Sequence, residues 1–256
     1  LSHPYIQNFL EHRDDVDLGN DVRVIVVDTR NDDIFNADYM DALKELTDDV
    51  YALQGVDPAA ISSLWTPNVR WNEVTEEGFQ GGEVIPIAYD GGAESLEELR
   101  TNVLRSGQVG RLVADDFRSS IIHAGLLDVL SPDSDVDIPT LAASLEELRG
   151  EYEERYPFIR IHIVGIAKKI GDVIEAAQEV ALFFFVTLGL TALLLLLDTR
   201  SLKSSLTVVV CSFVAVIWQL GVVASLGFTI DPYSMLVPFL VFAIAVSHGV
   251  QIINSF

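Results

Sequence analysis

Three long apolar runs follow Glu179 and limit what this chain can fold into. They cover residues 180–197, 206–226 and 235–256, and the first two contain no charged side chain. Each is about 18 to 22 residues long, close to the roughly 20 residues that an α-helix needs to cross the hydrocarbon core of a bilayer. A core helix of a soluble protein rarely stays apolar over this length. The sequence therefore predicts three transmembrane helices.

The charged residues divide the chain into two domains. Residues 1–179 hold 14 of the 16 Lys and Arg and 36 of the 38 Asp and Glu, so they carry the whole formal net charge of −22 (14 − 36). We therefore expect an acidic soluble domain at 1–179 and a transmembrane domain at 180–256. The acidic charge excludes nucleic acid as a partner, because phosphate binding needs clustered Lys and Arg. It indicates a solvated surface, with attraction of cationic substrates as the alternative.

The loops between the apolar runs predict the orientation of the chain. The loop at 198–205 holds Arg200 and Lys203, whereas the loop at 227–233 holds no basic residue. Because Lys and Arg concentrate in cytoplasmic loops, the first loop is expected in the cytoplasm. The acidic domain then lies on the opposite side of the membrane, which is the periplasm in a bacterium. The chain starts at Leu1 and stops at Phe256 inside an apolar helix pattern, so we expect both ends to be cut from a longer protein.

The acidic domain shows a mixed pattern of strands and helices. We expect strands at 21–28, 60–65, 111–114, 119–127 and 158–165, and helices at 37–53, 95–106, 139–156 and 167–179. Asn36 and Ser95 are expected to cap the first two helices. The stretch 66–92 reads as an irregular insertion, and the last helix runs straight into the first apolar run. This order predicts an α+β, ferredoxin-like (split βαβ) domain with an insertion, followed by an all-α transmembrane bundle.

No catalytic constellation stands out in the sequence. There is no Cys-x-x-Cys, no His-Glu-x-x-His and no phosphate-binding loop, so we expect neither an enzyme nor a cofactor. The only cysteine is Cys211, and His3, His12 and His123 are scattered, which suggests no metal site. The pair Asp115-Asp116 favours a tight turn over paired catalytic acids.

The third apolar run carries the candidate site. At 100° per residue, its polar residues fall within an arc of about 120°: Ser247, His248, Gln251, Asn254 and Ser255. Such a stripe should face protein or water rather than lipid. His248 is its only ionisable group and is therefore a functional candidate, the alternative being a neutral histidine that hydrogen-bonds a neighbouring helix. Ala243, Ala245 and Gly249 would let another helix approach closely.

Three segments resemble a known family. The stretch GFTIDPYSMLVPFLVFAIAVSHGVQIIN (Gly227–Asn254) resembles the third-to-fourth helix region of exporters of the resistance-nodulation-division (RND) superfamily, in its MmpL-like and sterol-sensing-domain-like branch. GVDPAAISSLWTPNVRW (Gly55–Trp71) and GFQGGEVIP (Gly78–Pro86) are similar to proteobacterial exporters of this type. The resemblance implies the N-terminal half of such a protein: a periplasmic porter-type domain and the first transmembrane helices of a truncated bundle.

The resemblance also implies a function and a coupling site. It implies a bacterial inner-membrane exporter of hydrophobic or amphipathic molecules, lipids among them, driven by a proton or other ion gradient. Its partners would be the bilayer, the second half of the same chain, a lipid-like substrate and further copies of the chain. In the family the fourth helix usually carries a carboxylate that takes up and releases protons, and here Ser247 falls on that position with His248 next to it.

Three explanations for the missing carboxylate remain open. His248 substitutes as the titrating group with Ser247, Gln251 and Asn254 beside it, the second half holds the acid, or the driving ion differs. A different class of function is a non-transporting, lipid-sensing or scaffolding membrane subunit with the same fold.

Overall fold

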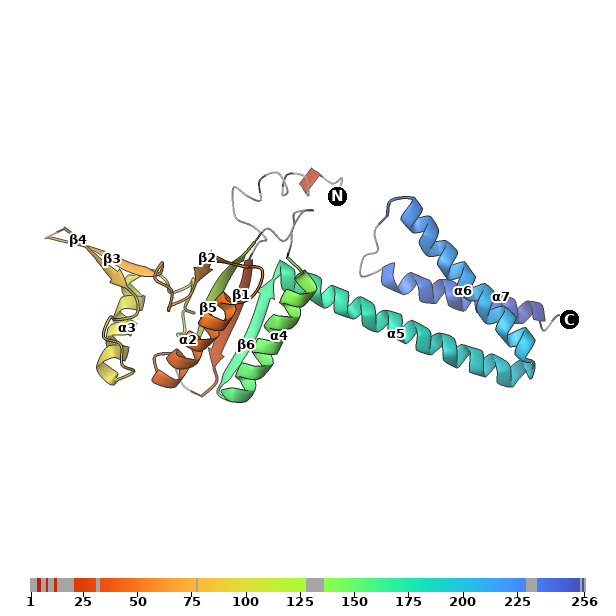
Figure 1. Cartoon of the computed structure of the whole chain (residues 1–256), viewed down its shortest axis with the longest axis horizontal. Helices are drawn as coiled ribbons and strands as arrows, with labels where there is room; N and C mark the ends of the chain where they lie inside the picture. Colours follow the sequence, from red (N-terminus) through yellow and green to blue (C-terminus); the bar gives the residue numbers. More distant parts are fainter. Residues whose placement is uncertain are drawn as a thin grey trace. The chain divides into compact units, whose positions relative to one another are not determined.

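The computed structural model describes residues 4, 5, 8, 12, 21–30, 33–76, 78–127, 136–228, 234–253 and 255, with only the backbone of Ile166. The elements are β1 (Asp21–Asp28), α2 (Ala37–Tyr51), β2 (Val56–Ser62), β3 (Arg70–Thr75), β4 (Gly78–Glu83), α3 (Ala93–Arg105), β5 (Ser119–Leu126), α4 (Ile138–Arg155), β6 (Ile159–Gly165), α5 (Ile166–Thr199), α6 (Leu202–Ser225), η1 (Ser234–Leu236) and α7 (Val237–Ile253). They form two compact units, Leu1–Asp172 and Val173–Phe256 (Figure 1). The prediction of a mixed α/β region followed by three apolar helices is confirmed.

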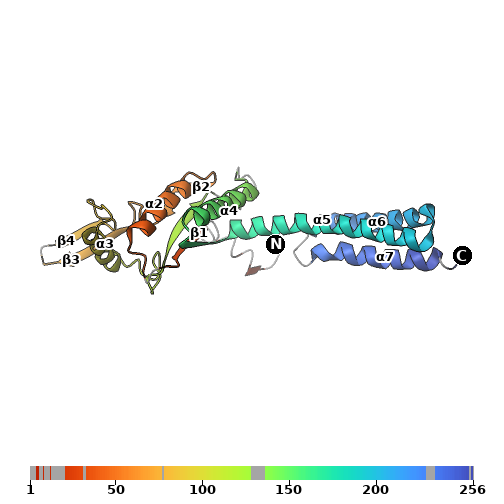
Figure 2. The same cartoon turned by 90° about the horizontal axis from the view of Figure 1, so that it is seen from below.

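The first unit is built on a four-stranded antiparallel sheet in the order β2-β5-β1-β6. The central strand β1 places Val24 opposite Ile122 of β5 and opposite Ile163 of β6. The connections β1–α2–β2 and β5–α4–β6 each pass over one strand and join two parallel strands. The two βαβ motifs of this sheet are therefore interleaved. Helices α2 and α4 lie side by side on one face of the sheet (Figures 1 and 2).

The core of the first unit lies between this sheet and its two helices. Along β1, Val22, Val24 and Val26 are at most 2% exposed, because alternate side chains of a strand point to the same face. Tyr39 of α2 is fully buried, and its hydroxyl donates to the carbonyl of Val26 (2.8 Å) and accepts from the amide of Ser120 (3.0 Å). Burial raises the pKa of Tyr39 above its ordinary value, so the hydroxyl keeps its proton and fixes α2 to β1 and β5.

The two helix caps expected from the sequence have different outcomes. Asn36 caps α2, since its side-chain oxygen accepts from the amide of Tyr39 at 2.9 Å, and this prediction is confirmed. The prediction of Ser95 as a cap is wrong, because α3 begins at Ala93 and Gly92 is its N-cap residue. The hydroxyl of Ser95 instead donates to Asp90 Oδ1 (2.8 Å), which also accepts from the amide of Gly92 (2.8 Å).

The sequence predicted an irregular insertion at 66–92. This prediction is wrong in part, because the segment contains the β3–β4 hairpin. Its glycines hid the strand pattern. A Cβ at Gly81 would lie 2.5 Å from Asn72 Oδ1, and one at Gly82 would lie 3.1 Å from Trp71 Nε1. These two positions therefore leave room for side chains of the facing strand, which explains glycines in the interior of a strand.

Two predicted strands also differ from the structure. The strand expected at 111–114 is wrong: this segment forms a turn after Gly110 (φ 79°), and only Val113 bridges to Ser120. The strand expected at 60–65 lies earlier, at Val56–Ser62, and includes Pro58. β2 is an edge strand whose register shifts between Val56 and Ile61, which is where a proline without an N–H donor is tolerated.

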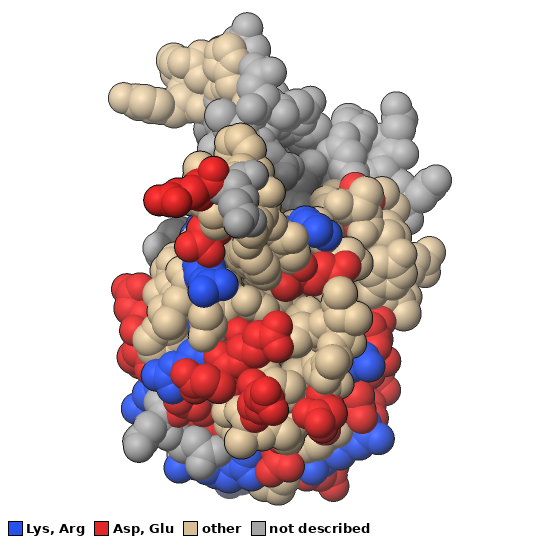
Figure 3. All heavy atoms as spheres, turned by 90° about the vertical axis from the view of Figure 1, so that its left-hand side faces the viewer, with Lys and Arg blue, Asp and Glu red and all other residues tan. Residues whose placement is uncertain are grey.

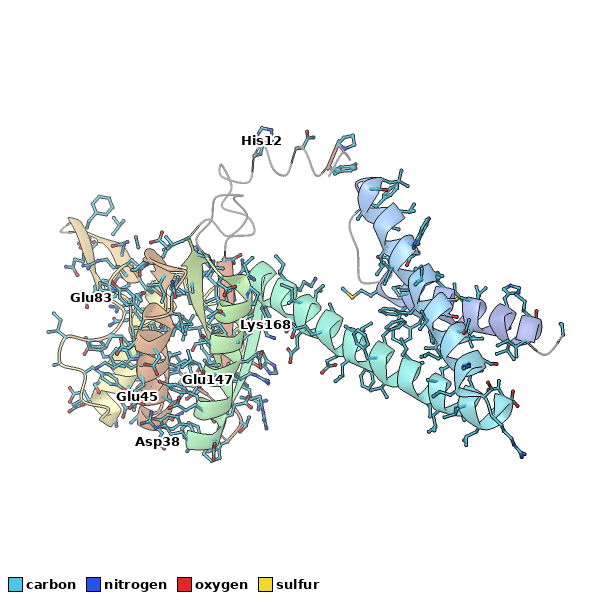
Figure 4. The ribbon with its side chains drawn as sticks, turned by 45° about the vertical axis from the view of Figure 1, so that its right-hand side comes forward. His12, Asp38, Glu45, Glu83, Glu147 and Lys168 are labelled. Carbon is cyan, nitrogen blue, oxygen red and sulfur yellow. The ribbon has the colours of Figure 1, made fainter. Side chains whose placement is uncertain are left out.

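Helix α5 continues from the first unit into the second, as the sequence predicted. Its first turns pack on α4, where a Cβ added to Gly171 would lie 2.3 Å from the Cβ of Ala142. Lys168, labelled in Figure 4, donates to Glu146 of α4 at 2.9 Å. Among the described residues, three helices are long and apolar enough to cross a membrane: Ala167–Thr199, Leu202–Ser225 and Ser234–Ile253.

Candidate functional site

Helix α7 packs against α5 and α6 through one apolar face. Phe242 is 3% exposed, and its ring centroid lies 5.6 Å from that of Phe184 on α5. Phe239 meets the same Phe184 ring edge-on at 5.2 Å. Further along the helix, Val246 and Val250 pack against buried residues of α5 and α6. Aromatic and branched side chains at helical spacing therefore fix which side of α7 faces its two neighbours.

Gly249 lies at a close approach of α7 to α6. A Cβ added to it would lie 2.8 Å from Val208 Cγ1 and 3.2 Å from Val208 Cγ2. Carbon atoms in good contact lie about 3.5–4.0 Å apart, so only glycine fits without movement of the neighbouring helix. The sequence expectation of a close approach is confirmed at Gly249, whereas Ala243 is exposed and Ala245 is half-buried.

The candidate polar residues lie on the other side of α7. Ser247, His248 and Gln251 are all exposed, and none of their side chains forms a hydrogen bond or ion pair with another described residue. At 100° per residue, Gln251 and His248 lie about 140° and 160° around the helix from Val246. The structure thus brings three of the four predicted residues together on the face turned away from α5 and α6. Asn254 lies outside the described residues.

This polar face defines what α7 needs from its surroundings. At membrane depth an ionisable or hydrogen-bonding side chain costs several kcal/mol unless it meets protein or water. Helices α5 and α6 do not supply that partner, since they cover the opposite face of α7. An imidazole has two ring nitrogens, which can bind a proton or a metal ion. The arrangement can therefore hold a proton or bind an ion, provided that protein or water covers the face.

The sequence pattern did not reveal a second feature of the helical unit, an apolar cleft between its three helices. We name this cavity of about 490 Å³ the aromatic cleft. Its walls come from the first half of the α5 span, the second half of α6 and the start of α7: Ala177, Val180, Ala181, Phe184, Phe185, Phe213, Val216, Ile217, Leu220, Ser234, Met235, Pro238 and Phe239. The run Phe183-Phe184-Phe185 was the sequence signal that could have indicated this cleft. Three successive rings cannot all face one side of a helix, so some of them must face a neighbouring helix or a cavity.

The electrostatics of the first unit agree with a solvated acidic surface. Figure 3 shows Asp and Glu spread over the face that carries β3, β4 and α3, with Lys and Arg between them. Glu146 illustrates the local balance: desolvation raises its pKa, but hydrogen bonds from Lys168 and Arg149 outweigh this and lower it overall. Asp115 and Asp116 lie in a turn, as expected, and the amide of Arg118 donates to Asp116 at 3.0 Å.

The described part of the chain contains no group of three or more His, Cys, Asp or Glu side chains placed to hold a metal ion. Comparison with known proteins adds no assignment. No protein-family model matches this chain, and no curated protein matches it. The RND resemblance therefore stays a prediction, based on the three segments quoted above.

Proposed function

We propose that this chain is part of an inner-membrane exporter of the RND type, which moves hydrophobic or amphipathic molecules, lipids among them, at the expense of an ion gradient. The observation that carries the proposal is the polar face of α7, with Ser247, His248 and Gln251 exposed on a membrane-length helix. A helix that only anchors a domain gains nothing from such a face, whereas an ion pathway requires one. We propose that the second half of the same chain, or a further copy, covers it.

The topology of the first unit supports the same proposal. Its strand order β2-β5-β1-β6, with two interleaved βαβ units, is the arrangement expected of a ferredoxin-like porter domain. The β3–β4 hairpin and α3 are then the insertion between the second and third strands of that plan. We place this domain in the periplasm, because Arg200 and Lys203 lie in the loop between α5 and α6 and favour the cytoplasm.

The aromatic cleft supports the class of substrate. Its volume of about 490 Å³ falls within the usual range for small-molecule sites, and nearly all of its lining side chains are apolar. It suits an acyl chain or another apolar body and offers nothing to a small hydrophilic solute. Ion coupling would then belong to His248 on the opposite face of α7, so that one helix contacts both sites.

Transport in proteoliposomes tests the proposal on the full-length protein. We expect His248→Ala and His248→Gln to abolish movement of a fluorescent lipid driven by a pH gradient, because neither side chain can carry the proton. Ile252→Ala is the matched control: Ile252 is also exposed on α7, one turn beyond His248, but its side chain cannot carry a proton, so transport should persist. Unchanged transport in both histidine variants would remove His248 from the mechanism.

A lipid-sensing or scaffolding subunit is the second candidate function, and the aromatic cleft also favours it. A sensor would bind lipid in the cleft without moving it. Wild-type protein that binds a fluorescent fatty acid, yet transports nothing under a proton, sodium or potassium gradient, would decide for this alternative.

A further inference from the structure

A polar cavity lies on the helix-free face of the main sheet. Because Val22 and Val24 of β1 point into the core, Arg23 between them points to the opposite face. Arg23 lies directly across from His123 of β5, which in turn lies across from Ser62 of β2. The turn at 108–112 adjoins this row, since the amide of Ile121 on β5 donates to the carbonyl of Leu112 at 2.8 Å.

Together these elements enclose about 720 Å³. The lining residues are Arg23, Ala60, Ser62, Asn68, Val69, Gln108, Gly110, Arg111, Leu112, Ile121 and His123. Among the described residues, two arginines and one histidine line the cavity and no Asp or Glu does, in a chain with 38 acidic and 16 basic residues. The lining of the cavity is therefore basic, although the net charge of the chain is negative.

The guanidinium groups of Arg23 and Arg111 have N–H donors that are not used in hydrogen bonds with the other described residues. The carboxylate of Asp21 lies beside both Arg23 and His123. Its Oδ2 atom accepts a hydrogen bond from Arg23 Nε at 2.9 Å and lies 3.1 Å from His123 Nε2. This bond uses only Nε of Arg23 and leaves the terminal nitrogens of the guanidinium fork. The guanidinium of Arg111 forms no hydrogen bond or ion pair within the described residues.

A neutral donor completes the set. Asn68 Nδ2 donates to the carbonyl of Ile61 at 2.8 Å and to Ser62 Oγ at 3.2 Å. The Ser62 hydroxyl therefore acts as an acceptor toward Asn68, and its own proton remains to be donated into the cavity. Two forked guanidinium groups and a hydroxyl form a donor set that suits the oxygens of a phosphate or carboxylate.

We propose that this cavity binds an organic oxyanion, its phosphate or carboxylate held by Arg23 and Arg111 with Ser62 as a further donor. The volume of the cavity is within the usual range for drug-sized ligands, so the anion is expected to carry an organic body. The chain as a whole is acidic, so a cavity lined by two arginines is a local departure from its net charge. The proposal does not depend on transport, because binding is measured without a gradient.

Calorimetric titration of the whole chain in nanodiscs of uncharged lipid tests it with three soluble probes. Phenyl phosphate supplies an oxyanion with an organic body, inorganic phosphate supplies the anion alone, and phenol supplies the body alone. We expect phenyl phosphate to bind and phenol not to bind. Saturable binding of inorganic phosphate at similar affinity would identify the source as the free anion, whereas preference for phenyl phosphate would identify an organic phosphate.

Charge-matched variants locate the site. Arg111→Gln should weaken phenyl phosphate binding about tenfold or more, because a charge-assisted fork is lost. The substitution breaks no hydrogen bond or ion pair between the guanidinium and the other described residues. Arg118→Gln removes the same charge from an exposed arginine outside the cavity and should leave the affinity unchanged. The proposal is overturned if neither anion binds, or if the two variants weaken binding equally, which would indicate a general effect of net charge.

Discussion

The contact of Gly249 with Val208 makes a sharp prediction about the packing of α6 on α7. In Gly249→Ala the new methyl carbon would lie 2.8 Å from Val208 Cγ1, about 0.7 Å inside the range of good carbon contacts. Val208 is 5% exposed and β-branched, so its side chain has little freedom to turn away. Overpacking of this kind typically costs about 1–3 kcal/mol.

A second glycine separates this cost from the effect of glycine itself. Replacing glycine by alanine within a helix favours the helix by roughly 1 kcal/mol. An added Cβ at Gly221 of α6 would meet no other described part of the protein within 4 Å beyond its own helix backbone, so Gly221→Ala should show this gain alone. We therefore expect Gly249→Ala to be about 1–3 kcal/mol less stable than Gly221→Ala.

The assay is the free energy of unfolding in detergent micelles, measured by titration with dodecyl sulfate. The double variant Val208→Ala/Gly249→Ala should recover part of the loss, because removal of the two valine methyl groups makes room for the new one. Equal stability of the Gly249 and Gly221 variants, within about 0.5 kcal/mol, would refute the close approach of α6 and α7.

Two further predictions concern the first unit. Tyr39→Phe should lower the free energy of unfolding by about 1–3 kcal/mol, because it removes the buried hydroxyl that bonds both the amide of Ser120 and the carbonyl of Val26. Thermal unfolding followed by circular dichroism measures this, and Tyr51→Phe, at an exposed tyrosine, should change little. The folded-state pKa of Glu146 is lowered, so its stabilisation is present above the pKa of the unfolded chain and is lost as the pH falls through the folded-state value. Glu146→Gln should therefore flatten the acid limb of the stability profile, by about 1 kcal/mol or less because the side chain is still partly exposed to solvent. An unaltered acid limb would show that its ion pairs contribute nothing.

The parts of the fold that sequence reasoning found are those with a strong local pattern. The run at 21–28 alternates buried valines, Asn36 precedes a helical spacing, and the long apolar runs leave few options other than membrane helices. The parts that it missed depend on contacts distant in sequence. Glycines at 81 and 82 looked like loop residues, although they serve the facing strand, and the segment at 111–114 has strand-like composition but only one bridging residue.

The candidate site was predicted in the same uneven way. Helical periodicity places Ser247, His248 and Gln251 on one face without knowledge of any neighbour, and the structure brings them together. Periodicity cannot say which neighbouring helix covers which face, and α5 and α6 cover the opposite one. Neither the aromatic cleft nor the polar cavity on the main sheet could be predicted from the sequence, for a related reason. The walls of each come from at least three elements, and His123 looked isolated in the sequence.

One face of α7 packs on α5 and α6 and the other carries polar side chains, and the proposed coupling depends on this difference. At Gly249 the apolar face lies so close to Val208 that α7 cannot shift against α6 unless the side chains between them repack. Its polar face contains a group whose charge can change, and a charged imidazole requires more protein or water around it than a neutral one. In the proposed function, protonation of His248 would act on whatever covers the polar face, because α5 and α6 cover the opposite face of α7. The proposed export would require this change to shift the surroundings of α7 between two states.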